Sequence, residues 1–268
     1  MKLGGFHEMY GRTLDVSQIT EKKLDLSYGE DPAEKLDIYY PESGTPPYSV
    51  IVFFHGGGFF KGDKSRYQLY PALQGIYNGY VVVSANYRML PEFTLPAAFE
   101  DAISVIEYLK SNSTQLNIDK EKISVWGESA GATLACYAGM KCQLKAIIDW
   151  YSPMRMDQIS SSILEEAESA AKDFAEFVYG EDAYRKNKQY DLRNFVDKDV
   201  PPVFIQHGTA DQLVSPEASK QFYEKLKDHL PEEDLIYIEV EKGRHGVEDY
   251  QNEENLEKVF SFLNKYTK

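Results

Sequence analysis

The fold is decided by residues 122–140, KISVWGESAGATLACYAGM, where a short apolar run leads through a glycine-flanked serine into a helical pattern. We predict a buried strand at Lys122–Gly127 and a helix at Ala130–Met140. The serine between them, Ser129, is the centre of a G-x-S-x-G sequence. In a strand–turn–helix context this sequence holds a serine hydroxyl above a sheet, and the glycines relieve crowding at the sharp turn. Ser129 is therefore a candidate nucleophile, and the amide of Ala130, at the helix N-terminus, is a candidate oxyanion donor.

On either side of this turn, β-rich runs alternate with amphipathic runs, which is typical of a mostly parallel sheet covered by helices on both faces. The predicted strands are Lys23–Ser27, Lys35–Tyr40, Ser49–His55, Tyr80–Tyr87, Lys122–Gly127, Lys145–Trp150, Pro202–His207 and Leu235–Glu241. The predicted helices are Ala97–Ser111, Ala130–Met140, Pro216–His229 and Glu253–Lys265. The first two strands alternate in hydrophobicity and should form an outer hairpin at one edge, whereas the third, fourth, fifth and seventh are nearly continuous apolar runs.

The composition excludes several classes of protein. The chain has 268 residues, of which 43% are hydrophobic, and this content supports a packed core rather than disorder. Its 29 basic and 43 acidic residues give a net charge of −14, which argues against nucleic acid as a partner. The longest apolar run, Val50–Phe54, is far shorter than the roughly 18 residues that a membrane span needs.

The two cysteines, Cys136 and Cys142, form neither a disulfide framework nor a metal-ligand pattern, so we expect no metal. Residues 1–10 lack a basic segment followed by an apolar one, so no secretory signal is expected. Both features lead us to expect a cytoplasmic protein.

A second glycine-rich stretch, His55-Gly56-Gly57-Gly58-Phe59, follows the third predicted strand. A dinucleotide fingerprint fails because Lys61 stands where its last glycine is needed, and a phosphate loop fails because Asp63 follows Gly62. An oxyanion loop with Gly57 and Gly58 as backbone donors fits the stretch, and His55 is then a structural residue at its base.

A serine nucleophile needs a base and an acid, which follow the serine in the order acid and then histidine in this kind of sheet. His7 and His55 precede Ser129, His207 precedes the nearest acid, and His229 lies in a polar helix tail. His245, between two glycines in the loop after the last strand, is therefore the candidate base. The candidate acid is Asp211, which would fix the tautomer of the imidazole; its alternative role as a helix cap suits Ser215 better.

One segment interrupts the alternation of strands and helices. Residues 153–200 have helical propensity but contain no strand pattern. Excursions of this length inside a compact domain are usually functional. We predict a small helical cap at about 153–200 over the carboxyl edge of the sheet within a single domain, 1–268; a decorative surface insertion is the alternative.

With these motifs in place, the chain resembles the α/β-hydrolase superfamily, and within it the hormone-sensitive-lipase-like carboxylesterases and their acetyl-carbohydrate esterase relatives. The resemblance runs from about Lys35 to the C-terminus. It is carried by His55–Phe59, Asn86-Tyr87-Arg88 with Pro91-Glu92, Leu95–Ala98 with Asp101, Trp126–Gly131, His207–Val214 and Gly243–Gly246. It implies an eight-stranded α/β-hydrolase sheet, a serine-hydrolase mechanism without a cofactor, and a small-molecule substrate that is a short-acyl ester.

Two rival functions stay open beside the esterase. An amide or formamide hydrolase would use the same triad of Ser129, Asp211 and His245, and a non-catalytic ligand-binding protein would use the same fold. Phe59 and Phe60, next to the oxyanion loop, are expected to line the substrate pocket. Glu128 is expected to order the nucleophile turn, and Arg88 and Asp101 to form a buried polar contact. The sequence leaves the oligomeric state open.

Overall fold

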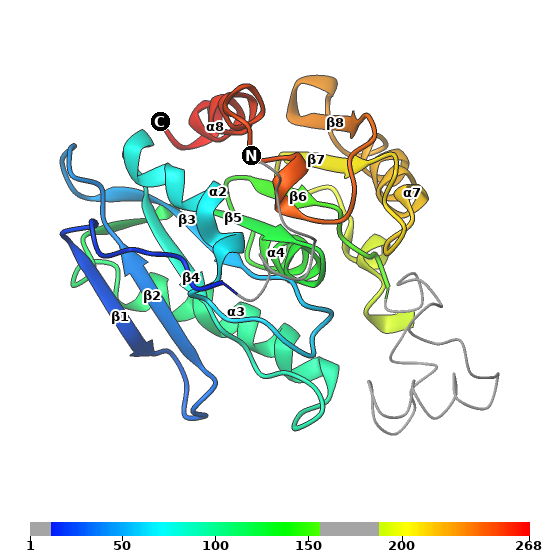
Figure 1. Ribbon diagram of the computed structural model, residues 1–268. Coiled ribbons are helices and arrows are strands. Elements are labelled where there is room, and N and C mark those ends of the chain that lie inside the picture. The colour runs from blue at the N-terminus through cyan, green and yellow to red at the C-terminus, as the bar shows by residue number, and fades with distance from the viewer. Residues whose placement is uncertain (1–11, 156–187) are drawn as a thin grey trace.

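The computed structural model describes residues 12–155 and 188–268 (Figure 1). Its centre is an eight-stranded sheet in the order β1-β2-β4-β3-β5-β6-β7-β8. The strands are β1 (Lys22–Ser27), β2 (Lys35–Tyr39), β3 (Tyr48–Phe54), β4 (Val81–Ala85), β5 (Ile118–Glu128), β6 (Ile147–Trp150), β7 (Val203–Gly208) and β8 (Leu235–Val240). The pairs β1–β2 and β2–β4 are antiparallel, and all other pairs are parallel. The predicted mostly parallel sheet with an outer hairpin is confirmed.

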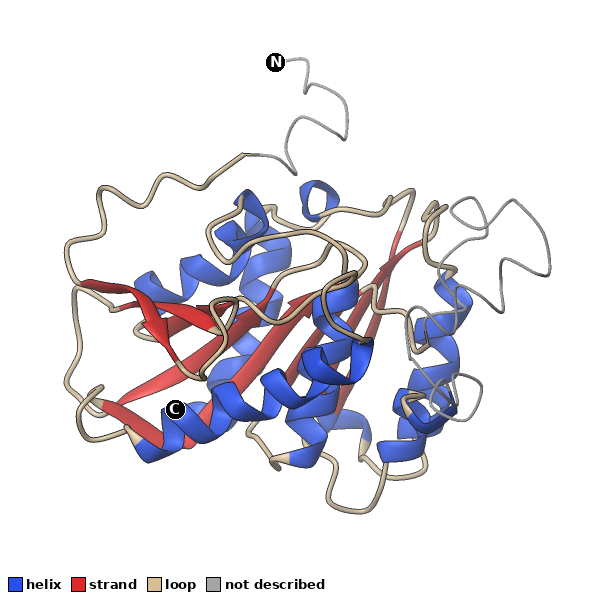
Figure 2. Cartoon of the chain, turned by 90° about the horizontal axis from the view of Figure 1, so that it is seen from below, coloured by secondary structure: helices blue, strands red, loops and turns tan. Residues whose placement is uncertain are grey.

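Helices cover both faces of this sheet (Figure 2). The α-helices are α2 (Tyr70–Leu73), α3 (Leu95–Ser111), α4 (Ala130–Lys141), α7 (Pro216–Leu226) and α8 (Glu253–Thr267). Short 3₁₀ helices lie at Tyr67–Leu69, Gln74–Asn78, Leu192–Phe195, Glu232–Asp234 and Val247–Asp249. The helices α3, α4 and α7 contribute to one apolar core, whereas α2 and α8 contribute to a second core on the opposite face.

Alternate residues of the central strands belong to these two cores. In β3, Val52 and Phe54 pack in the core of α3, α4 and α7, while Ile51 and Phe53 pack in the core of α2 and α8. Because successive side chains of a strand point to opposite faces, a strand covered on both faces needs apolar residues at every position. This requirement explains why β3 is a continuous apolar run in the sequence.

Some element boundaries differ from the predictions. Strand β5 begins at Ile118 rather than Lys122, because Ile118 already pairs with Tyr48 before the register shifts. The residues between Ile118 and Lys122 are polar, so the apolar pattern of the sequence did not indicate this extension. Helix α7 ends at Leu226 rather than at His229, whose amide donates to the Leu226 carbonyl in a turn. The short helices between Tyr67 and Asn78 were not predicted, since single turns carry no recognisable 3.6-residue period.

The predicted cap lies mainly outside the described residues, which exclude 156–187. The described end of the segment packs on the helices beside the sheet. Tyr190 contacts Phe99 of α3 with 4.5 Å between ring centroids, and Phe195 contacts Tyr137 of α4 at 5.0 Å. The helical nature of the cap and the single-domain boundaries stay predictions.

A buried ion pair fixes the loop that follows β4, as the sequence suggested. Arg88 Nη2 lies 2.6 Å from Asp101 Oδ1, and the Arg88 amide donates to Asp101 Oδ2 at 2.7 Å. The Asp101 side chain is fully buried at the second turn of α3. Bidentate pairing of this kind satisfies a carboxylate that burial would otherwise destabilise.

Candidate active site

Ser129 occupies a strained turn between β5 and α4. Its backbone has φ = 52° and ψ = −126°, a conformation that side-chain-bearing residues rarely adopt. A Cβ on Gly127 would lie 2.2 Å from the Gly131 carbonyl oxygen, and one on Gly131 would lie 2.0 Å from the Phe54 carbonyl oxygen. The glycines therefore let the first turn of α4 pack directly against the end of β3.

The three predicted triad residues lie together although they come from three different loops. His245 Nε2 is 2.8 Å from Ser129 Oγ, and His245 Nδ1 is 2.7 Å from Asp211 Oδ2. Because a carboxylate can only accept, Nδ1 carries a proton, and Nε2 is left to accept from the serine hydroxyl. This is the hydrogen-bond pattern that general-base activation of a serine requires.

Asp211 is a buried anion with several donors. Its side chain has no exposed surface, and its Oδ1 accepts from the amides of Leu213 at 2.9 Å and Val214 at 3.0 Å. Burial alone would raise the pKa of Asp211, but hydrogen bonds from His207 and His245 and from the Val214 amide hold that pKa well below its usual range. The carboxylate thus stays ionised beside the imidazole.

Side chains of other elements form hydrogen bonds with the backbone of the glycine-rich loop after β3. The Gly56 amide donates to Glu128 Oε1 at 2.8 Å, and the Tyr87 hydroxyl donates to the His55 carbonyl at 2.8 Å. The His55 ring is buried and stacks on Tyr87 with 4.5 Å between centroids, which fits its predicted structural role. Burial lowers the pKa of His55, so the imidazole is favoured in its neutral form.

Gly57 and Gly58 both require the freedom of glycine. Their φ angles are 126° and 64°, and a Cβ on Gly57 would lie 1.8 Å from the Lys61 carbonyl oxygen. Strands β3 and β5 are parallel neighbours, with Phe54 paired to Gly127, so this loop and the Ser129 turn leave the sheet side by side. The oxyanion role of the Gly57, Gly58 and Ala130 amides stays a prediction.

The two phenylalanines after the loop point to different surroundings. Phe59 is buried and contacts Tyr87 and Phe99, and it lines a small cavity together with other residues. Those other residues are Leu95, Phe99, Thr133, Pro153, Arg155 and Tyr190. Phe60 is 40% exposed and does not line this cavity. The substrate-pocket role predicted for Phe59 and Phe60 stays a prediction.

Two further residues of the site were not predicted. His207, rejected as a base, lies 3.2 Å from Asp211 Oδ2, a contact that its spacing from the acid does not predict. Tyr151, which follows β6, donates to Glu128 Oε2 at 2.8 Å, and its ring lies 4.8 Å from that of His245. No motif in the sequence pointed to Tyr151.

Within 12–155 and 188–268, no group of three or more His, Cys, Asp or Glu side chains is arranged to hold a metal ion. In the same part of the chain, no helix combines the length and the apolar character needed to cross a membrane.

Comparison with known proteins relates the chain to esterases. It is 28% identical over 207 residues to an acetyl esterase of Salmonella choleraesuis, covering 72% of this chain and 63% of that protein. It is 29% identical to esterase LipI of Mycobacterium tuberculosis, covering 65% of this chain and 53% of that protein. The matches thus span less than two thirds of the length of these curated relatives.

Solved structures share the fold. A truncated carbohydrate esterase from gut microbiota superimposes with a TM-score of 0.80 at 23% identity, covering 96% of this chain and 99% of that one. A propionate-bound esterase of Thermogutta terrifontis superimposes with a TM-score of 0.70 at 22% identity, covering 94% of each chain. A family model described as BD-FAE matches residues 36–226, well over half of the sequence. The chain therefore belongs to the BD-FAE family of α/β-hydrolases.

Proposed function

We propose that the chain is a serine esterase that cleaves short-acyl carboxylic esters, acetylated carbohydrates among them, through an acyl-enzyme. The observation that carries the proposal is the continuous contact from Ser129 Oγ through His245 to Asp211, at 2.8 and 2.7 Å. This arrangement activates a hydroxyl nucleophile and needs no cofactor to do so.

In the proposed mechanism, Ser129 Oγ attacks the ester carbonyl while His245 Nε2 takes the hydroxyl proton. Asp211 stabilises the imidazolium that forms. The amides of Gly57, Gly58 and Ala130 donate to the oxyanion of the tetrahedral intermediate. The imidazolium then protonates the departing alcohol, and a water molecule activated by the same histidine hydrolyses the acyl-enzyme.

Support for a short acyl group comes from relatives and from the cavity beside Phe59. The relatives include an acetyl esterase, a carbohydrate esterase, and an esterase solved with propionate and with butyrate bound. Among the residues that line this cavity, Phe59 follows Gly58 in the glycine loop and Thr133 lies one turn along α4 from Ser129. Its other walls include the bulky side chains of Leu95, Phe99 and Tyr190.

The nucleophile is tested with Ser129→Ala. We expect loss of p-nitrophenyl acetate hydrolysis by about 10⁴-fold or more, as for other triad knockouts, and loss of labelling by a fluorophosphonate probe. Ser111→Ala, at an exposed serine at the end of α3, is the matched control and should behave as the unaltered protein. Full activity of the Ser129→Ala variant would exclude the proposed mechanism.

The substrate class is tested with p-nitrophenyl esters from acetate to laurate, together with acetylated xylose and N-formylkynurenine. We expect kcat/KM to be highest for acetate to butyrate and to fall by about tenfold or more at octanoate, because bulky walls exclude long chains. Preference for laurate would refute the short-acyl assignment. Faster cleavage of N-formylkynurenine than of any ester would favour the formamide hydrolase.

A further inference from the structure

Asp211 lies between two buried histidines. Its Oδ2 is 2.7 Å from His245 Nδ1 on one side and 3.2 Å from His207 Nε2 on the other. His207 is the last but one residue of β7, four positions before the acid, and is fully buried. The mechanism proposed above gives it no role.

The partners of His207 determine which of its nitrogens carries a proton. Nε2 faces two atoms that can only accept, Asp211 Oδ2 at 3.2 Å and the Val214 carbonyl oxygen at 3.0 Å. Nδ1 lies 2.7 Å from Ser219 Oγ of α7, a hydroxyl that can either donate or accept. Nε2 therefore carries a proton whether the ring is neutral or charged, and His207 donates toward the acid in both states.

With this contact the Asp211 carboxylate has four N–H groups around it. Oδ1 accepts from the amides of Leu213 and Val214, and Oδ2 accepts from His245 Nδ1. Oδ2 also lies 3.2 Å from His207 Nε2, whose single N–H is shared with the Val214 carbonyl oxygen. Two carboxylate oxygens offer about four acceptor sites, and four N–H groups face them. In a buried site each lost donor is costly, because no water replaces it.

We propose that His207 is a positioning residue for the triad acid. With Ser219 it forms a second imidazole–hydroxyl pair on the far side of Asp211, so that the hydrogen-bond chain runs Ser129–His245–Asp211–His207–Ser219. The second pair keeps the buried carboxylate ionised and aimed at His245. This inference rests on the proposed function, since it assigns a task to His207 within that site.

Other ionisable groups face this chain and bear on any pH dependence. Asp149 of β6 interacts electrostatically with His207, and Glu128 of β5 does so with His245. The Tyr151 ring lies 6.4 Å from that of His207, and Tyr250 interacts electrostatically with Asp211. All four stay in place in the variants described next, so their contributions cancel in the comparison.

The tautomer is tested first, without any assay of turnover. The unaltered protein, labelled with ¹⁵N-histidine, is measured by NMR near neutral pH, and His207→Gln identifies the His207 signals. We expect a proton on Nε2 of His207. A neutral ring with its proton on Nδ1 would overturn the proposal, because Nε2 could then not donate to Asp211.

The kinetic test compares His207→Phe with His207→Gln. Phenylalanine removes the donor, so we expect kcat to fall about ten- to hundredfold, the effect of losing one hydrogen bond to an ion, with KM within about twofold. The acid limb of the pH profile of kcat/KM should move to higher pH by about half a unit to one unit, since a carboxylate with one donor fewer stabilises the protonated, inactive form of His245 more strongly. A glutamine amide has two N–H donors for Asp211 and Val214 and should keep kcat within about fivefold.

Ser219→Ala removes the hydroxyl on the far nitrogen and should give a smaller change in the same direction. A folded His207→Phe variant with unaltered kcat and acid limb would overturn the proposal, and if that variant does not fold, the NMR result decides. Failure of this inference is distinguishable from failure of the proposed function. Activity that survives in Ser129→Ala refutes the function, whereas an inactive Ser129→Ala beside a fully active His207→Phe refutes only the role of His207.

Discussion

At the scale of single residues, Glu128 joins two loops that meet beside the nucleophile. Its Oε1 accepts from the Gly56 amide, and its Oε2 accepts from the Tyr151 hydroxyl, each at 2.8 Å. The side chain is fully buried, and burial raises the pKa of Glu128 against the opposing effect of the Tyr151 hydrogen bond. Glu128 thus positions the glycine loop by accepting a hydrogen bond from the backbone amide of Gly56, rather than by acting on substrate.

Truncation of this side chain should damage activity. In Glu128→Ala the Gly56 amide loses its partner and the loop can shift, and a shift of about 1 Å in a catalytic group can cost about 100-fold in rate. We expect kcat for p-nitrophenyl acetate to fall about ten- to hundredfold in Glu128→Ala. Glu128→Gln, which keeps an acceptor for Gly56, should stay within about fivefold.

Glu121→Ala, at an exposed position of the same strand, is the control for this experiment. Circular dichroism establishes that each variant is folded before its rate is compared. Equal rates for Glu128→Ala and the unaltered protein would show that the loop needs no support from this carboxylate.

The sequence could identify the site residues that lie in loops after predicted strands, but it could not identify every contact among those residues. Ser129, Asp211 and His245 were found because each follows a predicted strand and the order of acid and base was expected. His207 was considered only as a competing base. Its contact with Asp211 depends on how the chain folds back after β7, which no spacing rule specifies.

At the scale of elements, burial on both faces made the central strands predictable. The sequences of β3 and β4 are almost wholly apolar because helices cover both of their faces. The 3₁₀ helix Tyr67–Leu69 and the four-residue α2 depend instead on tertiary contacts, such as the burial of Leu69 and Leu73 against the sheet. Single turns like these have no local pattern from which they could be read.

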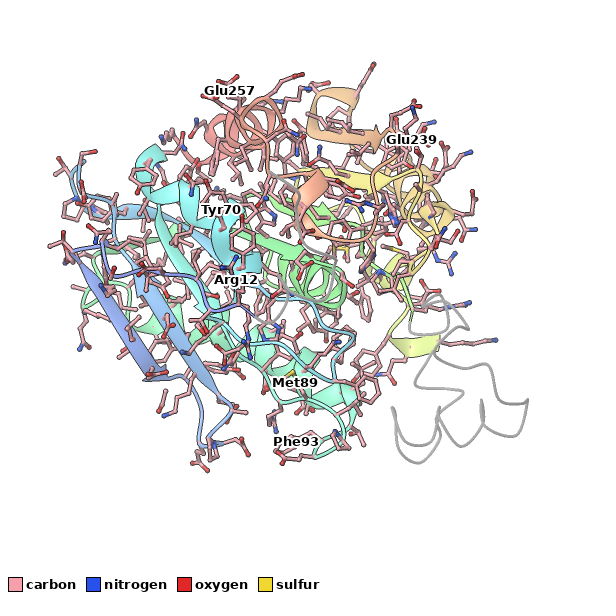
Figure 3. All side chains as sticks on the ribbon, viewed as in Figure 1. Arg12, Tyr70, Met89, Phe93, Glu239 and Glu257 are labelled. Atoms are coloured by element: carbon pink, nitrogen blue, oxygen red, sulfur yellow. The ribbon has the colours of Figure 1, made fainter. Side chains whose placement is uncertain are left out.

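At the scale of the whole molecule, exposed carboxylates contribute to the net charge of −14. Glu239 on β8 and Glu257 on α8 are exposed at the outer side of the molecule (Figure 3). Exposed carboxylates such as these affect solubility more than the fold. A carboxylate inside the core affects the stability of the fold more than solubility, and Asp149 of β6 is such a group.

Asp149 is fully buried beside α4. The Ser152 hydroxyl donates to its Oδ2 at 2.8 Å and the Ser152 amide to its Oδ1 at 3.1 Å. Burial nevertheless raises the pKa of Asp149 to about 6. In the unfolded chain the same carboxyl would titrate near 3.9. The folded state therefore binds the proton more tightly, and the contribution of Asp149 to stability decreases as the pH rises from about 4 to about 6.

Asp149→Asn should remove this dependence, because an amide does not titrate. The free energy of unfolding of the variant minus that of the unaltered protein should increase by up to about 3 kcal/mol between pH 4 and pH 7.5, as measured by urea denaturation. A change in free energy of unfolding that the substitution causes equally at both pH values cancels when the two differences are compared. Asp228→Asn, at an exposed carboxylate after α7, should give a difference that is the same at both pH values. A difference for Asp149→Asn that is equally independent of pH would mean that this carboxylate ionises in the folded protein without cost, as a group with access to water would.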